Sequence, residues 1–202
     1  GGSVGAVGGT LIPNRTNQQG VVSYTTATVA TNYIMHVSGQ TAYIWFGGGA
    51  WNYETSINIA NLSTVTERYR WLSGFGATSG GATETDGVFF TYDEGGTANG
   101  TAASPNWQCV TVANGVRTLT TTSTAVTAAA WNKLRIEINA AGTSVAFYVN
   151  GTLVATHTTN IPLASSSRYV LVKQGLFKTI GTTARLVYCD YIGYENILTT
   201  AR

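Results

Sequence analysis

The sequence predicts an all-β fold, a sandwich of two antiparallel sheets in a single domain. From residue 20 onward the chain consists of short runs rich in Val, Ile, Thr, Tyr and Phe, which favour strands. Gly and Asn interrupt these runs roughly every dozen residues, and no stretch repeats apolar residues at the helical period. With 44% hydrophobic content, the 202 residues suffice for one substantial core.

The first ten residues, GGSVGAVGGT, are half glycine and show no periodicity. Ordering glycine costs more backbone entropy than ordering any other residue. We therefore expect a flexible leader over residues 1–10, followed by one sandwich domain over residues 11–202.

The clearest strand lies in WNKLRIEIN, residues 131–139. Leu134, Ile136 and Ile138 alternate there with polar and charged residues, which predicts one buried face and one face in water. The following stretch, SVAFYVNGTLVATH, predicts a hairpin closed by Asn150 and Gly151, because this pair accepts the positive φ angles of a two-residue primed turn.

That turn also predicts the register of the hairpin. Val149 is expected opposite Thr152, Phe147 opposite Val154, and Val145 opposite Thr156.

The last strand-like stretch, ARLVYCDYIGYE, is largely apolar and is predicted to lie inside a sheet. It contains one of the two cysteines, Cys189; the other, Cys109, lies in a second strand-like stretch. Neither has metal-ligand spacing, and we expect two buried free thiols rather than a disulfide.

The charge content and the lengths of the apolar segments argue against two classes of partner. The chain has 10% charged residues and a net charge of +2, and its eleven basic residues form no run or stripe, so we expect no nucleic acid partner. No apolar segment reaches the roughly 20 residues that span a bilayer, so we expect no membrane insertion.

Four stretches together resemble a known family: DGVFFTYD, NWQCVTVANGVRTLTTTSTAV, WNKLRIEINAAGTSVAFYVNGTLVATHTTNIP and LVYCDYIGY. They are similar to concanavalin A-like jelly rolls, in particular those of structural proteins of tailed bacteriophages and prophages, over roughly residues 20 to 195. The resemblance implies a jelly-roll β-sandwich. It also implies a virion-surface protein, such as a head fibre, a decoration protein or a tail-associated domain, in contact with other virion proteins.

A surface poor in charge, with Thr-rich and Ala-rich stretches such as RTLTTTSTAVTAAAW, lacks the Lys and Glu that usually prevent association. We therefore expect a homo-oligomer such as a trimer.

Carboxylates gather in TETDGVFFTYDEGG, residues 83–96. Laminarinase-type jelly-roll hydrolases carry Glu-x-Asp-x-(x)-Glu on one strand, and Glu84 and Asp86 match its first half. Val88 and Phe89 stand where the second glutamate is required, so the proton donor of the reaction is missing. We predict that these acids cap the ends of a strand, in preference to binding calcium or catalysing a reaction.

Alginate-lyase-like jelly rolls carry Gln-Ile-His or Gln-Val-His, with a tyrosine base next to arginine. The histidines of this chain, His36 and His157, have no glutamine two places before them. The sequence therefore predicts no catalytic residues and no enzyme.

Two further kinds of site remain open. Asp93, in the loop DEGGTANG, and Asp190, in the last strand, are the candidate ligands for a structural calcium; no other cofactor is expected. Trp45, Trp51 and Tyr53, in YIWFGGGAWNYE, are candidates for stacking on a sugar, although filling the core is the commoner role of such rings.

The leading hypothesis is a non-enzymatic structural or attachment module of a phage virion, with a host-surface glycan as a possible contact. The alternative is a lectin-like carbohydrate-binding domain, and the third hypothesis is a polysaccharide-cleaving enzyme.

Overall fold

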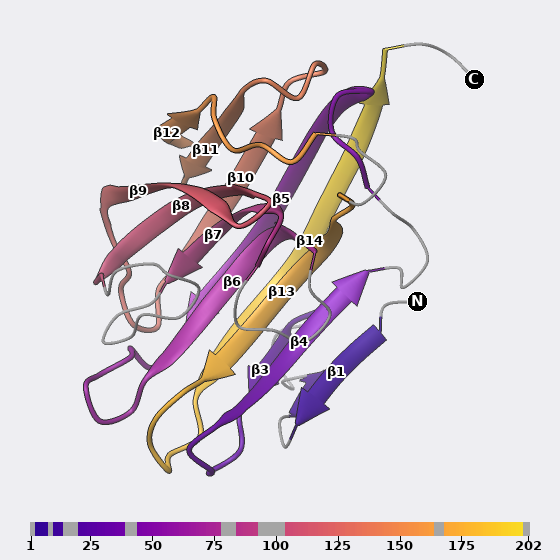
Figure 1. The fold of residues 1–202 in the computed structure, drawn as a ribbon. Coiled ribbons are helices and arrows are strands. Elements are labelled where there is room, and N and C mark those ends of the chain that lie inside the picture. Colours follow the sequence, from indigo (N-terminus) through magenta and orange to yellow (C-terminus); the bar gives the residue numbers. More distant parts are fainter. Residues whose placement is uncertain are drawn as a thin grey trace.

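The computed structural model describes residues 3–7, 10–13, 20–38, 44–77, 84–92, 104–163 and 168–199. Two seven-stranded sheets lie face to face, and every paired strand is antiparallel to its neighbour (Figure 1). The predicted all-β, jelly-roll sandwich of two antiparallel sheets is confirmed. Within the described ranges, no helix is long and apolar enough to cross a membrane.

The front layer in Figure 1, here called sheet A, has the strand order β1-β4-β13-β6-β7-β8-β9. Its strands are β1 (Ser3–Val7), β4 (Asn32–Ser38), β13 (Leu171–Lys178), β6 (Tyr69–Gly76), β7 (Gly87–Tyr92), β8 (Asn106–Ala113) and β9 (Val116–Ala125).

The other layer, sheet B, has the order β12-β11-β10-β5-β14-β3-β2. Its strands are β12 (Thr152–His157), β11 (Val145–Val149), β10 (Trp131–Ile138), β5 (Gly49–Ile59), β14 (Leu186–Leu198), β3 (Val22–Thr25) and β2 (Thr10–Pro13).

The glycine-rich start of the chain, which the sequence predicted to be a flexible leader, contains a strand. Ser3–Val7 forms β1 and pairs with β4 at the edge of sheet A. Strand pairing uses backbone N–H and C=O groups, which glycine also carries. Because this stretch has no side-chain periodicity, its sequence did not predict the strand.

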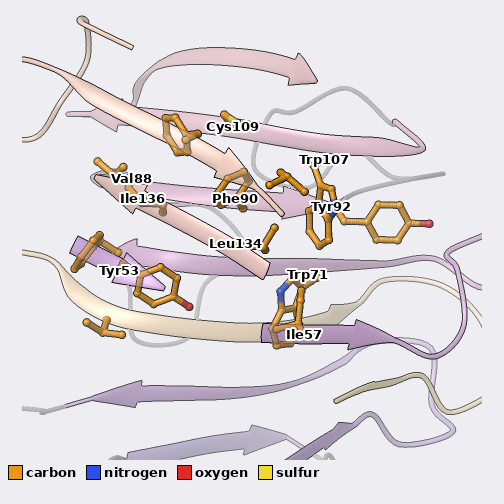
Figure 2. Packing of buried hydrophobic residues seen from close by; sticks show 14 of the residues in the cluster. Tyr53, Ile57, Trp71, Val88, Phe90, Tyr92, Trp107, Cys109, Leu134 and Ile136 are labelled. Atoms are coloured by element: carbon orange, nitrogen blue, oxygen red, sulfur yellow. The ribbon is translucent and has the colours of Figure 1, made fainter. Parts of the chain in front are cut away.

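The main core lies between the sheets (Figure 2). Aromatic rings from both sheets meet edge-to-face there: Phe90 of β7 and Phe147 of β11 have ring centroids 5.3 Å apart. Tyr24 of β3 and Trp71 of β6 are 5.1 Å apart. Such pairs add to the hydrophobic contribution of burial and join the two sheets directly.

Strand β10 follows the predicted alternation. Leu134, Ile136 and Ile138 are buried in the core, while Lys133 is exposed and Arg135 lies at the outer surface. In Figure 2 the side chains of Leu134 and Ile136 lie among the labelled core residues of the opposite sheet. This alternation fixes which face of sheet B meets water.

The β11–β12 hairpin keeps the predicted turn but not the whole predicted register. Val149 pairs with Thr152 as expected, whereas Phe147 pairs with Ala155 and Val145 pairs with His157. A register shift between Phe147 and Tyr148 causes the difference, since one extra residue of β12 is accommodated there. The shift brings His157 next to Phe147, with ring centroids 5.1 Å apart.

Sheet A is also buried on its outer face. A second apolar cluster there consists of Met35, Val37, Leu72, Phe89, Val110, Val112, Leu171 and Phe177, with Tyr33 packed against it. This explains why β6, β7 and β13 are buried at every position. Of these strands, β7 reads as a largely apolar run. Strands β6 and β13 also bury polar and charged side chains, such as Arg70, Lys173 and Gln174.

Candidate functional site

The outer face of sheet B carries an open polar groove, here called the sheet B groove. It crosses the three adjacent strands β10, β5 and β14, whose register places their outward side chains in rows. Arg135, Glu54 and Gly193 form one row. Glu137, Asn52 and Glu195 form the next, roughly 7 Å along the strands.

The groove consists of two adjoining hollows. The first, of about 380 Å³, is lined by Asn52, Tyr53, Glu54, Arg135, Glu137, Gly193, Tyr194 and Glu195. The second, of about 340 Å³, shares Asn52 and Glu137 with the first and extends to Ala50, Asn139, Ser144 and Ile197. Together they form an elongated depression along the strands, suited to a chain-like ligand.

Gly193 leaves the middle of the groove open. A Cβ atom placed on this residue would have only the backbone oxygen of Glu54 within 4 Å, at 3.9 Å. A larger side chain would therefore fit without a clash and would occupy the hollow. The glycine accounts for part of the depth of the groove.

Hydrogen bonds hold the side chains on the β14 side of the groove. Asn52 donates from Nδ2 to Glu195 Oε1 at 2.7 Å, which joins β5 to β14. The Tyr191 hydroxyl donates to Glu54 Oε1 at 2.7 Å, and Lys133 Nζ lies 3.0 Å from the same oxygen. These contacts position two carboxylates and one amide before any ligand arrives.

The β10 side is positioned by Arg135. Its Nη1 atom lies 2.7 Å from Glu137 Oε1, and its guanidinium lies over the ring of Tyr148 at 4.1 Å from the centroid. The hydrogen bond between the Tyr148 hydroxyl and Glu137 raises the pKa of that hydroxyl above its usual value. Tyr148 thus remains a hydrogen-bond donor at neutral pH.

Partial burial alone would raise the pKa of the Glu54 carboxyl. The hydrogen bonds from Tyr191 and Lys133 outweigh it, together with the positive charges of Lys133 and Arg135, and lower that pKa. Glu54 is therefore a charged hydrogen-bond acceptor at neutral pH. The groove as a whole presents carboxylates, an amide, a guanidinium and tyrosine hydroxyls, which are the groups that bind sugar hydroxyls.

The three aromatic candidates from the sequence lie in different surroundings. Tyr53 is fully buried, and its hydroxyl pairs with Ser73 at 2.7 Å in the core, so its ring cannot stack on a sugar. Trp51 is half-buried and packs edge-to-face against Phe75. Trp45 is 54% exposed, and its backbone oxygen accepts a hydrogen bond from Trp51 Nε1 at 3.1 Å.

The acids before β7, which the sequence predicted to cap the ends of a strand, contact other segments of sheet A. Glu84 is fully buried in an ion pair with Lys173 of β13. Asp86 accepts a hydrogen bond from the backbone N–H of Asn114 at 2.9 Å and lies 3.8 Å from Arg168. Both carboxylates hold segments of sheet A together.

Of the two predicted calcium ligands, Asp190 is exposed on β14, at the bulge between Cys189 and Tyr191. Asp93 lies outside the described residues. Among the residues that the structure describes, no group of three or more His, Cys, Asp or Glu side chains could hold a metal ion. Cys109 and Cys189 are free and buried, and burial raises the pKa of the Cys189 thiol to about 11.

His157 is also a structural residue. Its Nδ1 atom pairs with Thr111 Oγ1 at 3.1 Å and its Nε2 with Thr120 Oγ1 at 2.9 Å. The Thr111 hydroxyl donates to the backbone oxygen of Thr159, so it accepts from Nδ1–H of the ring. Burial lowers the pKa of His157. The neutral imidazole therefore joins β12 of sheet B to β8 and β9 of sheet A.

Sequence reasoning missed most of the groove residues. The outward positions of β5, Asn52, Glu54 and Ser56, alternate with buried ones, and this pattern was a usable signal for a wet strand face. Nothing in the sequence indicated that β5 lies between β10 and β14. The grouping of Asn52, Glu137 and Glu195 follows from that order.

The sequence pattern of a protein family, the SO2946-like C-terminal domain, matches residues 17–190 of this chain. The chain belongs to the SO2946-like family. A search of curated proteins finds no match to this SO2946-like domain.

Solved structures similar to this SO2946-like domain share its fold at low sequence identity. The protein of unknown function SO2946 from Shewanella oneidensis MR-1 has a TM-score of 0.66 and 14% identity, over 100% of this chain and 80% of that one. The carbohydrate recognition domain of Emp47p has a TM-score of 0.61 and 8% identity, over 98% and 89% of the two chains. The alginate lyase from Corynebacterium sp. has a TM-score of 0.60 and 11% identity, over 92% and 80%.

These similarities correct the prediction that the chain is not an enzyme. Several similar structures are alginate lyases, at 6 to 13% identity. One fold hosts many activities, so the absence of two known motifs does not exclude catalysis. A bacteriophage origin has no support among these structures, which at this identity show the fold alone.

Proposed function

We propose that this SO2946-like domain binds carbohydrate in the sheet B groove. The observation that supports this proposal is the groove itself. It is an open, elongated hollow with Asn52, Glu54, Arg135 and Glu137 at its surface and Gly193 at its centre. Sugars present many hydroxyl groups, and each can donate one hydrogen bond and accept two. Carboxylates, amides and guanidinium groups in fixed positions satisfy them.

The positions of these groups support the proposal. Each of the four side chains is already hydrogen-bonded or paired with a neighbour, so little rotamer entropy is lost when a ligand binds. The similarity to a carbohydrate recognition domain and to alginate lyases supports the same class of ligand.

Gly193→Val is the sharpest test of the groove. The new side chain meets no atom closer than 3.9 Å at its Cβ, so the variant should fold, while its methyl groups occupy the hollow. We expect glycan binding, measured on a glycan array and by isothermal titration with the best hexasaccharide, to fall at least tenfold.

Gly48→Val is the matched control. A Cβ atom placed on Gly48 would have no other atom within 4 Å, and this residue lies between Trp45 and Trp51 in the chain. The variant should bind glycan like the unchanged protein. Loss of binding in Gly48→Val with normal binding in Gly193→Val would refute the groove and place the site at Trp45 and Trp51.

The virion role remains a second proposal, and the edge of sheet A supports its homo-oligomeric part. Strand β9 ends sheet A, and its ten residues include a single charge, Arg117, and an exposed Val116. Such an edge favours association with other chains. We propose a homo-oligomeric, glycan-contacting module on a phage surface. A monomeric mass by light scattering, together with absence of the chain from purified particles by mass spectrometry, would refute it.

A further inference from the structure

We infer that the sheet B groove accepts glycans of uncharged sugars and rejects polyuronates, and that Glu195 is the main residue responsible. This inference rests on the proposed function and names the class of ligand. One similar structure, an alginate lyase, holds dimannuronate, which is a uronate. The charges at the groove of the present chain instead favour uncharged sugars over uronates.

The charges at the groove set this preference. Three carboxylates, Glu54, Glu137 and Glu195, face two cations, Lys133 and Arg135. Each cation is already paired with a carboxylate, Lys133 with Glu54 at 3.0 Å and Arg135 with Glu137 at 2.7 Å. The cations therefore have little attraction left for the carboxylate of a ligand.

Glu195 carries the unbalanced charge. It accepts a hydrogen bond from the neutral amide of Asn52, and among the described residues it forms no ion pair with a Lys, Arg or His side chain. It lines the same hollow as Glu54 and Glu137. A uronate in this hollow would meet a like charge with no cation between them.

The hydrogen-bonding pattern leads to the same ligand class. Each of three donor side chains of the groove has one contact with a carboxylate of the groove: Asn52 with Glu195, Tyr191 with Glu54, and Arg135 with Glu137. Each carboxylate has about four acceptor positions, so acceptor capacity is in excess. Sugar hydroxyls supply the missing donors, whereas an ionised uronate group supplies only further acceptors.

The experiment compares affinities for named hexasaccharides by isothermal titration at low salt. The neutral probes are hexamers of mannose, glucose and galactose, and the anionic probe is hexamannuronate. We expect the best neutral hexamer to bind at least tenfold tighter than hexamannuronate. The difference should shrink in about 0.5 M salt, because exposed charges are screened there.

Glu195→Gln keeps the size and the acceptor oxygen of the side chain and removes its charge. It should raise the affinity for hexamannuronate about fivefold at low salt and leave the affinity for the neutral hexamer within about threefold. Asp190→Asn is the matched control: it removes a charge from an exposed residue of the same strand outside the groove, and it should change neither affinity.

The failures of the two proposals are distinguishable. Tighter binding of hexamannuronate than of every neutral hexamer by the unchanged protein, or no gain in Glu195→Gln, would refute the inference and leave carbohydrate binding standing. No binding of any hexamer by folded protein would refute the proposed function, and the inference with it.

Discussion

The two outer faces of the sandwich use charge in opposite ways. On sheet A, Lys173 and Glu84 pair in full burial, and Lys173 Nζ lies over the ring of Phe177, a member of the second apolar cluster. On sheet B, Lys133 pairs with Glu54 and Arg135 pairs with Glu137 at the surface around an open groove. The sheet A pair therefore maintains the fold, whereas the sheet B network contributes little stability and is available to a ligand.

This difference matters because charge is scarce in the chain, which has eleven basic and nine acidic residues. The groove and its rim hold five of them: Glu54, Lys133, Arg135, Glu137 and Glu195. A second group of charged side chains, Glu67, Lys178 and Arg185, lies elsewhere on the domain.

The largest effect is expected from breaking the buried pair. Glu84→Gln should leave the Lys173 ammonium buried without its counter-charge and should lower the free energy of unfolding by about 3 to 5 kcal/mol. Urea denaturation measures this. Replacing both partners, with Lys173→Met added, should recover part of the loss. Stability unchanged in Glu84→Gln would mean that this pair does not hold sheet A.

The core beneath the groove should be nearly as sensitive. Ile136→Ala should destabilise the domain by about 2 to 5 kcal/mol, because it removes a fully buried side chain. Arg135→Ala, one residue away on the groove side, should cost much less in stability but should weaken glycan binding. Equal losses of stability would show that the assigned faces of β10 are wrong.

Acid should destabilise the junction between β12 and sheet A. Burial lowers the pKa of His157 below its ordinary value of 6.5, so the unfolded chain takes up a proton at a higher pH than the folded one. Stability should be constant above about pH 6.5 and fall as the pH decreases through that value. His36 shifts in the same direction and adds to the effect.

Thermal melts between pH 5 and pH 7.5 measure this dependence. His157→Gln removes the titrating ring and should flatten part of the slope. A melting temperature that rises on acidification would contradict the assigned hydrogen bonds of His157.

The smallest effect on stability is expected in the groove. Glu195→Gln should change the free energy of unfolding by no more than about 0.5 kcal/mol, as is usual for an exposed side chain. Its effects should be confined to ligand choice. A large loss of stability in this variant would place Glu195 with the sheet A pair rather than with a binding surface.

The parts of the fold that sequence could predict depend on local pattern. Neighbouring residues determine both the burial alternation of Leu134, Ile136 and Ile138 and the turn at Asn150-Gly151. Both predictions are confirmed. The bulge between Phe147 and Tyr148 was missed, since nothing in the hairpin sequence marks the extra residue.

The candidate site could not be predicted because it depends on long-range pairing. Asn52 and Glu195 are hydrogen-bonded across 143 positions of sequence, and Lys173 pairs with Glu84 across 89. The aromatic residues misled for a related reason. Tyr53 stands next to partly exposed positions of β5 in the chain, yet strand alternation turns its ring into the core.

The most direct measurement is an NMR titration of ¹⁵N-labelled protein with the hexasaccharide that binds best. Carbohydrate binding in the sheet B groove predicts that the largest amide shifts lie in residues 52–54, 135–137 and 193–195 and saturate together. Shifts centred on Trp45 and Trp51, or on the strands of sheet A, would contradict it.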